Sequence, residues 1–140
     1  MKDGIRMAMI TALLWGITPI FDKLCVAKAS PAAVMAVRFT TTFLCILPLY
    51  LIPSFRSQIF ALDTRTTLYV VSAAVLSAIL GIFLYYWAMT KMEATKVTPI
   101  CATYPLVTFV LGILFLHEKM TWTKATGTIL SVLGIIFLSL

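Results

Sequence analysis

Residues 68–88 read LYVVSAAVLSAILGIFLYYWA and contain no charged side chain. An α-helix rises about 1.5 Å per residue, so about 20 apolar residues cross a hydrocarbon core about 30 Å thick. The length and composition of this run therefore predict a helix that spans a membrane.

Four other runs predict the same kind of helix: Ile5–Val26, Ala32–Ile52, Val97–Leu116 and Thr121–Leu140. The first is not interpreted as a cleaved signal peptide, because Asp22 and Lys23 interrupt the region that such a peptide keeps apolar. The sequence therefore predicts an all-α fold, a polytopic membrane helical bundle with five transmembrane helices in a single domain over residues 1–140.

The residues between these runs have the chemistry of helix ends. Ser30–Pro31 and Thr98–Pro99 each combine an N-cap with a proline at the first helical position, and Thr121 is a candidate cap for the last helix. Pro53–Ser54 closes the second run, and the gap from Pro53 to Thr67 is too short to bury a core of its own.

The composition agrees with a lipid environment for most of the chain. Hydrophobic residues make up 61% and charged residues 11% of the sequence, against about a quarter charged in soluble domains. The net charge of +6 comes from Lys and Arg residues that lie mainly in the short gaps between apolar runs. This pattern is typical of anchors that face anionic headgroups and not of a nucleic-acid interface.

No residue pattern indicates a metal, a cofactor or an enzyme. Cys25, Cys45 and Cys101 are odd in number, far apart and apolar in context, so we interpret them as reduced core residues. His117, the one histidine, stands with Glu118 at the end of the fourth run, which predicts a loop-side cap region. It does not supply the nucleophile and base, or the metal ligands, that an enzyme needs.

Polar and small residues recur at helical spacing inside the apolar runs, and lipid does not satisfy polar groups. We expect their faces to line a substrate pathway, although ordinary helix packing remains an alternative, above all for the third and fourth helices. The candidate pathway residues are Thr11, Trp15, Thr18, Asp22, Lys23, Arg38, Thr41, Tyr85, Thr98 and Pro105.

Asp22 and Arg38 lie eight residues before and after Ser30, where the first helix turns into the second. In an antiparallel hairpin they would lie at similar depth, and pairing would lower an insertion cost of about 2.5–3.5 kcal/mol per charge. The alternative is that Arg38 and Lys23 extend to nearby headgroups. Tyr86 and Trp87 predict an interfacial aromatic belt, whereas Trp15 near mid-span packs in the core or walls a cavity.

The fifth helix carries three small residues, Gly127, Ser131 and Gly134, on one face. Close backbone approach at such faces favours helix association in lipid, so we expect this face to form a dimer contact. The alternative is packing against the chain's own first or fourth helix.

These features resemble the EamA-like branch of the drug/metabolite transporter superfamily. The opening is Trp15-Gly16, Lys23, Pro31 and Arg38-Phe39. Later parts of the same resemblance are Tyr86-Trp87-Ala88-Met89, Ala94, Pro105, Leu116-His117-Glu118, Gly127 and Gly134. Met89 replaces the leucine usual in this pattern, and the pattern does not demand Asp22 beside Lys23.

The resemblance implies a five-helix repeat, of which typical members carry two in opposite orientation, with the substrate near the midplane. The second half would then be another copy, in a homodimer that is parallel or antiparallel, or a paired homologous half. The function it implies is secondary transport, with export of a small-molecule metabolite by alternating access. The alternative is a non-transporting membrane assembly or regulatory subunit.

Orientation is expected from the positive charges. Six Lys and Arg residues lie on the N-terminal side (Lys2, Arg6, Arg56, Arg65, Lys119 and Lys124) and four on the other (Lys23, Lys28, Lys91 and Lys96). This small excess favours a cytoplasmic N-terminus in a cytoplasmic (inner) membrane, and it also leaves dual insertion open.

Overall fold

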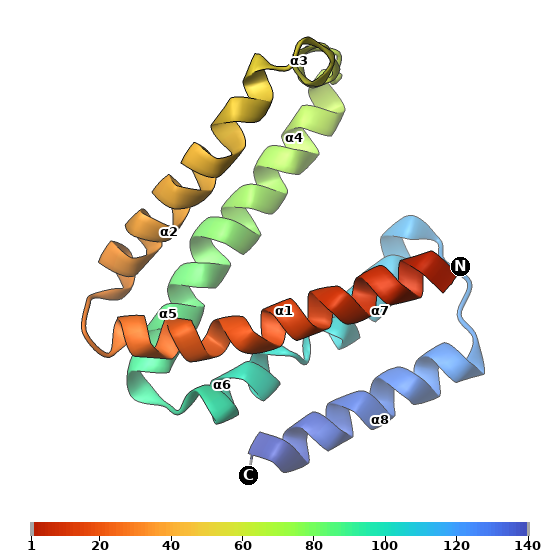
Figure 1. Ribbon diagram of the computed structural model, residues 1–140. Helices are drawn as coiled ribbons and strands as arrows, with labels where there is room; N and C mark the ends of the chain where they lie inside the picture. Colours follow the sequence, from red (N-terminus) through yellow and green to blue (C-terminus); the bar gives the residue numbers. More distant parts are fainter. Residues whose placement is uncertain (1, 140) are drawn as a thin grey trace. The chain divides into compact units, whose positions relative to one another are not determined.

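The computed structural model describes residues 2–139, and no strand occurs in this range. The elements are α1 (Lys2–Val26), α2 (Pro31–Ile46), the 3-10 helix η1 (Leu47–Leu51), α3 (Pro53–Phe60), α4 (Thr64–Ala73), the π-helix η2 (Ala74–Gly81), α5 (Ile82–Lys91), α6 (Ala94–Cys101), α7 (Tyr104–Leu116) and α8 (Trp122–Ser139) (Figure 1). They form two compact units, which we describe separately: residues up to Lys23 together with those from Lys91 onward, and residues 24–90.

The described part of the chain contains four helices long and apolar enough to cross a bilayer. They are Asp3–Val26, Pro31–Leu51, Thr64–Lys91 and Ala94–Leu116. The fifth predicted helix forms as α8, but its apolar stretch, Trp122–Leu138, is shorter, and the predicted end at Leu140 lies outside the described residues. The chain is thus an all-helical, multi-pass membrane protein with four clear candidate spans.

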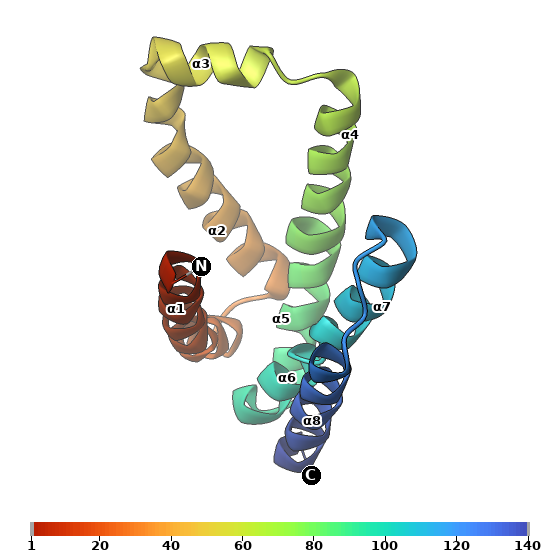
Figure 2. The same cartoon turned by 90° about the vertical axis from the view of Figure 1, so that its right-hand side faces the viewer.

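The unit of residues 24–90 contains two long helical segments, which we call its legs, and the short helix α3, which connects them. The leg α2–η1 begins with Ser30, whose hydroxyl accepts a hydrogen bond from the Ala33 amide at 3.3 Å, as the sequence predicts. The other leg, α4–η2–α5, begins with Asp63 as its N-cap. The legs run antiparallel and diverge toward α3, which connects their far ends (Figures 1 and 2).

Two features of this unit were not predicted. The expected gap contains α3, which has Pro53 in its first turn, where the missing amide hydrogen costs no helical bond. The third span includes the π-helix η2, which is rich in small residues. A side chain at Gly81 would place its Cβ 3.1 Å from the Leu76 carbonyl oxygen, so the absence of a side chain suits this crowded backbone.

The fourth span is broken into α6 and α7 at Ala102 and Thr103. Pro105 explains the break, because its ring has no amide hydrogen to donate to the Cys101 carbonyl and clashes with that group. The prediction that Thr98 caps this span is wrong. The cap is Glu93, and Pro99 lies inside α6, so the helix had already started one turn earlier.

The last helix, α8, packs against α6 and α7 in its own unit. Thr121 caps it as predicted, since its hydroxyl accepts from the Lys124 amide at 3.3 Å. Ala125, on the face that meets these neighbours, is buried. A single small side chain here lets helices approach closely without a large core.

Few side chains of the described residues are buried, and most of the large apolar ones are exposed. Leu13 is 70% exposed and Phe115 is 74% exposed. In lipid this arrangement is stable, because acyl chains solvate an apolar side chain as well as a protein core does. The prediction that Cys25, Cys45 and Cys101 are core residues is wrong for the same reason. All three are free thiols, but their side chains are exposed.

Candidate functional site

A polar contact between two candidate spans joins Arg38 of α2 to Tyr86 of α5. The Arg38 guanidinium donates a hydrogen bond to the Tyr86 hydroxyl at 2.5 Å and lies 5.8 Å from the centre of its ring. Arg38 is half-buried and Tyr86 is fully buried. A cationic donor on a phenol oxygen, with the ring beside it, stabilises the charge away from water.

The prediction that Tyr86 belongs to an interfacial belt is wrong, since such residues are exposed at the headgroups. The helical stripe selected its neighbour Tyr85, which is half-buried, with its ring 6.1 Å from that of Tyr86. Thr41, one turn after Arg38, is exposed. The one sequence signal for Tyr86 was its place in the family-like Tyr86-Trp87-Ala88 motif.

Asp22 and Lys23 lie near the end of α1, in the other unit. Asp22 is 8% exposed, although it carries a carboxylate. The Lys23 ammonium donates to the Met92 carbonyl at 2.7 Å, just beyond the end of α5. Carbonyls at helix ends attract cations, so this contact positions the ammonium. Asp22 and Arg38 belong to different units, and their pairing stays a prediction.

The three remaining candidates on α1 are Thr11, Trp15 and Thr18, and none of them is among the residues that line the groove between α7 and α8. The hydroxyls of Thr11 and Thr18 each donate to the carbonyl four residues earlier, Met7 and Leu14, at 2.9 Å. These bonds satisfy the hydroxyls inside an apolar helix. Trp15 is 66% exposed, so this chain alone does not bury it.

A groove of about 630 Å³ runs between α7 and α8, within the range of small-molecule sites. Of the predicted pathway residues, Pro105 lines it, together with Thr108 and Gly112 from the same helical stripe. Thr98 on α6 is half-buried and is not among the lining residues of this groove.

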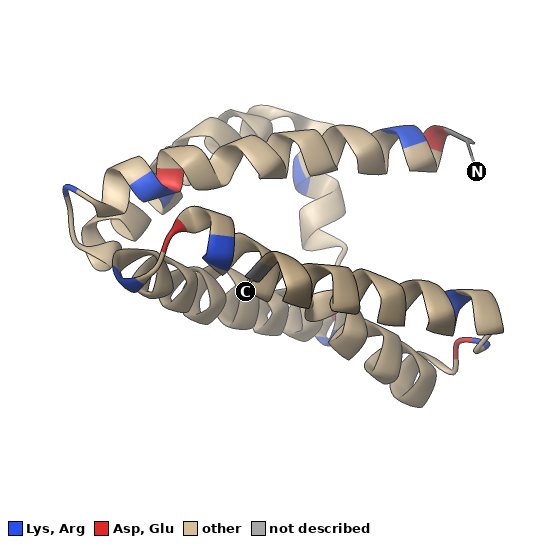
Figure 3. Ribbon diagram, turned by 90° about the horizontal axis from the view of Figure 1, so that it is seen from below, with Lys and Arg blue, Asp and Glu red and all other residues tan. Residues whose placement is uncertain are grey.

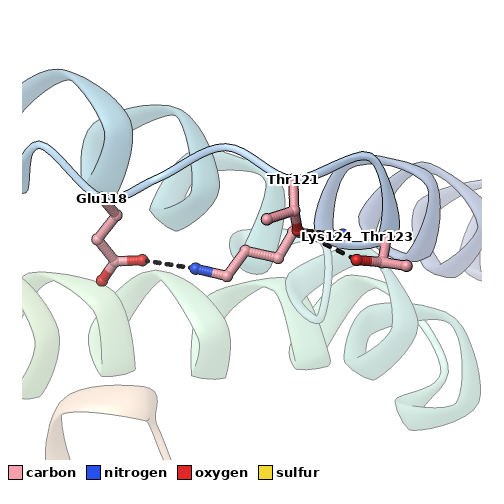
Figure 4. Close-up of polar contacts among 4 residues, drawn as sticks. All are labelled: Glu118, Thr121, Thr123 and Lys124. Carbon is pink, nitrogen blue, oxygen red and sulfur yellow. Dashed lines mark hydrogen bonds and ion pairs between the residues drawn. The ribbon is translucent and has the colours of Figure 1, made fainter.

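Glu118 and Lys124 also line this groove, and Figure 4 shows their side chains pointing toward one another. His117 ends α7 in the left-handed conformation (φ 52°), as a cap residue, which confirms the predicted cap region. The chain then turns back, and the Glu118 amide donates to the Gly112 carbonyl at 3.1 Å. The Glu118 carboxylate lies 3.4 Å from the Lys124 ammonium. Both side chains are half-exposed, so the pair orients the loop and contributes little to stability.

The small-residue face of α8 is open in this chain. Nothing lies within 4 Å of a Cβ built on Gly127 or Gly134, and the Ser131 hydroxyl donates to the Gly127 carbonyl at 2.8 Å. The helix therefore meets its neighbours through a different face, that of Ala125.

Charged residues of α1 and α8 lie near helix ends (Figure 3). On α1 these are Asp3 and Arg6 at one end and Asp22 and Lys23 at the other. Such a distribution suits helices whose middle parts lie in hydrocarbon. In the described residues, no group of three or more His, Cys, Asp or Glu side chains is placed to hold a metal ion.

Comparison with known families identifies the chain: residues 2–140 match the EamA-like transporter family. The chain belongs to this family. Its members are membrane transporters, so the resemblance seen in Trp15-Gly16, Arg38-Phe39 and the later motifs is confirmed as a family relationship.

Two relatives of this EamA-like chain are archaeal. An uncharacterized protein of Methanocaldococcus jannaschii is 29% identical over 140 residues, which cover 100% of this chain and 98% of that protein. A protein of Archaeoglobus fulgidus named as an uncharacterized transporter is 20% identical over 132 residues, covering 94% of this chain but 45% of the relative. The chain thus spans less than half the length of the second relative. No solved structure matches it.

Proposed function

We propose that the chain is a secondary transporter that exports a small metabolite across the cytoplasmic membrane. Two copies of the chain, or one copy and a homologous half, would form one complete transporter that works by alternating access. The observation that carries the proposal is the Arg38–Tyr86 hydrogen bond between two candidate spans.

An arginine inside a span is expensive to insert, by about 2.5–3.5 kcal/mol near the bilayer centre, and such residues usually mark a pathway. A residue that only anchored the helix would extend to the headgroups. Arg38 instead turns to a fully buried tyrosine on the facing leg of its unit. This contact keeps the charge at depth, where it is able to meet a polar substrate or another charge.

The pairing of two halves has separate support. The Archaeoglobus fulgidus transporter is more than twice as long as the region that this chain matches, whereas the Methanocaldococcus jannaschii relative has the length of one repeat. A chain with one repeat needs a second half to enclose a site between inverted repeats. The open faces of α1 at Trp15 and of α8 at Gly127 and Gly134 leave room for that half.

The α8 face is our proposed dimer contact. Glycines with no neighbour within 4 Å permit a second helix to approach the backbone closely. A near balance of six against four positive charges favours a cytoplasmic N-terminus weakly, so an antiparallel homodimer by dual insertion fits this proposal as well as a parallel one.

The function is tested in two steps. Purified protein is screened by thermal shift against a metabolite library, and a radiolabelled hit is then followed in exchange across proteoliposomes. We expect one or more metabolites to raise the melting temperature and to exchange in a protein-dependent manner. Ligands that bind without any exchange, or no ligand at all, would contradict transport and favour an assembly or regulatory subunit.

A further inference from the structure

The segment between Leu51 and Thr64 holds a helix that the hydropathy pattern does not indicate. It contains α3, which lies across the ends of the two long legs of its unit (Figures 1 and 2). The ring of Phe55 packs edge-on against Tyr50 of η1, with the ring centres 6.2 Å apart. This contact attaches α3 to the end of a candidate span.

The segment exposes large apolar side chains at that position. Leu51 is 83% exposed, Phe60 is 78% exposed and Leu62 is 47% exposed. Because α2–η1 and α4–η2–α5 are candidate spans, these side chains lie where the spans leave the hydrocarbon. Apolar groups at the end of a span are stable in the boundary between acyl chains and headgroups.

Two arginines accompany these apolar groups. Arg56 on α3 is exposed and has no hydrogen-bond or ion-pair partner for its side chain within residues 2–139. Arg65 donates from Nε to the Tyr69 hydroxyl at 2.9 Å, and its guanidinium lies 5.6 Å from the centre of that ring. This contact uses one of its five N–H donors and leaves the terminal nitrogens for another acceptor.

The nearby acid, Asp63, forms no ion pair with either arginine within residues 2–139. The Asp63 carboxylate accepts from the amides of Arg65 and Thr66, at 3.0 and 3.2 Å, and from the Thr66 hydroxyl at 2.5 Å. It therefore serves as the cap of α4. The segment combines exposed apolar side chains with two arginines. The planar guanidinium group of an arginine can donate two parallel hydrogen bonds to the oxygens of a phosphodiester.

We propose that α3 is an interfacial helix, and that Arg56 and Arg65 each bind phosphodiester groups of anionic phospholipids. The apolar side chains Leu51, Phe60 and Leu62 enter the acyl boundary, and the arginines hold headgroups above them. Bound lipid thereby sets the depth of the second and third spans. This proposal requires a membrane protein but no transport activity, so it stands or fails separately from the proposed function.

The first test is native mass spectrometry of the full chain in mild detergent with equal amounts of phosphatidylglycerol and phosphatidylcholine. We expect selective phosphatidylglycerol adducts. In the double variant Arg56→Gln, Arg65→Gln, selectivity should fall at least about five-fold, since one cation near an anionic surface contributes that factor. The charge-matched control Arg6→Gln, Lys119→Gln should retain the selectivity. Equal losses in both double variants would overturn the site, because they would show only a net-charge effect.

Excess inorganic phosphate distinguishes a lipid from a free anion. Phosphate should leave the adducts in place, because the acyl chains also bind. Loss of the adducts at millimolar phosphate would show a simple anion site and overturn the lipid assignment.

The second test measures depth without changing the arginines. Single nitroxide labels are placed at Phe60 and Gln58, two residues apart on opposite sides of α3, in a background without the three native cysteines. In phosphatidylglycerol nanodiscs, the Phe60 label should collide more with oxygen and the Gln58 label more with a water-soluble nickel chelate. Equal, water-like access at both positions would overturn the interfacial placement.

Discussion

The guanidinium of Arg38 and the hydroxyl of Tyr86 lie 2.5 Å apart, although 48 residues separate them in the sequence. Arg38 comes from α2 and Tyr86 from α5, so one contact joins two candidate spans. It also gives the Arg38 charge a partner within its own unit, so removing the contact tests what that partner contributes.

Replacing Tyr86 with Phe should destabilise the protein, because the half-buried guanidinium of Arg38 loses a hydrogen-bond acceptor while the ring volume is kept. Hydrogen bonds to charged groups contribute about 1.5–3 kcal/mol. The melting temperature in nanodiscs measures the effect. Tyr50→Phe is the control, since this tyrosine is partly exposed and its hydroxyl has no bond within the described residues. An equal, small shift in both variants would contradict a special role for Tyr86.

Arg38→Ala should abolish transport, whereas Arg38→Lys should retain part of it, with both variants expressed at similar levels. The reason is the need for a cation inside the span. Proteoliposome exchange of a ligand found by thermal shift provides the measurement. Normal exchange by Arg38→Ala would show that the residue only anchors the helix.

Single cysteines at Gly127, Ser131 and Gly134 should crosslink between chains in native membranes, in a background lacking Cys25, Cys45 and Cys101. Glycine positions with open space around them allow a second helix to approach. Cysteines at Leu130 and Leu133, which are also exposed, are the matched controls. A dimer demonstrated by other means, with no crosslink along α8, would place the contact elsewhere.

A reporter fused after residue 140 should lie on the side of the membrane opposite the N-terminus if α8 crosses the bilayer. A mixed population should appear if the chain inserts in both orientations. This test decides whether α8 spans the membrane, which its apolar stretch leaves open because it is shorter than the four clear candidate spans. Both ends on one side would reduce the count to four spans.

The Asp63 cap should depend on pH. Hydrogen bonds to the carboxylate, chiefly from the Thr66 side chain, lower the pKa of Asp63 below its ordinary 3.8. A lowered pKa in the folded state means that the cap contributes stability above about pH 3.8, and that this contribution is lost as the pH falls through the folded value. Amide exchange at Arg65 and Thr66 should accelerate below that range. Asp63→Asn, which keeps an acceptor, should remove this acceleration, and Asp63→Ala should show fast exchange at neutral pH.

Local chemistry explains why the spans and several caps were predictable. Hydropathy along the chain decides whether a segment enters lipid, and Ser30 and Thr121 act on amides three residues away. The break before Pro105 has an equally local cause. Hydropathy did not reveal it, because the run from Val97 to Leu116 is apolar whether or not its helix is continuous. The helix α3 was missed for a related reason: a short helix at the membrane surface needs neither length nor a continuous apolar run.

The sequence by itself determined that the chain is a helical, multi-pass member of a transporter family, since hydropathy and ordered motifs are properties of the chain alone. Only the tertiary structure decided that the hydroxyl of Tyr86 accepts a hydrogen bond from Arg38. It also decided that α8 meets its neighbours through the Ala125 face and leaves Gly127 and Gly134 open. The physical reason is that in lipid every face of an apolar helix is equally soluble. Hydropathy therefore cannot choose the contacting face, and close packing and the satisfaction of buried polar groups choose it instead.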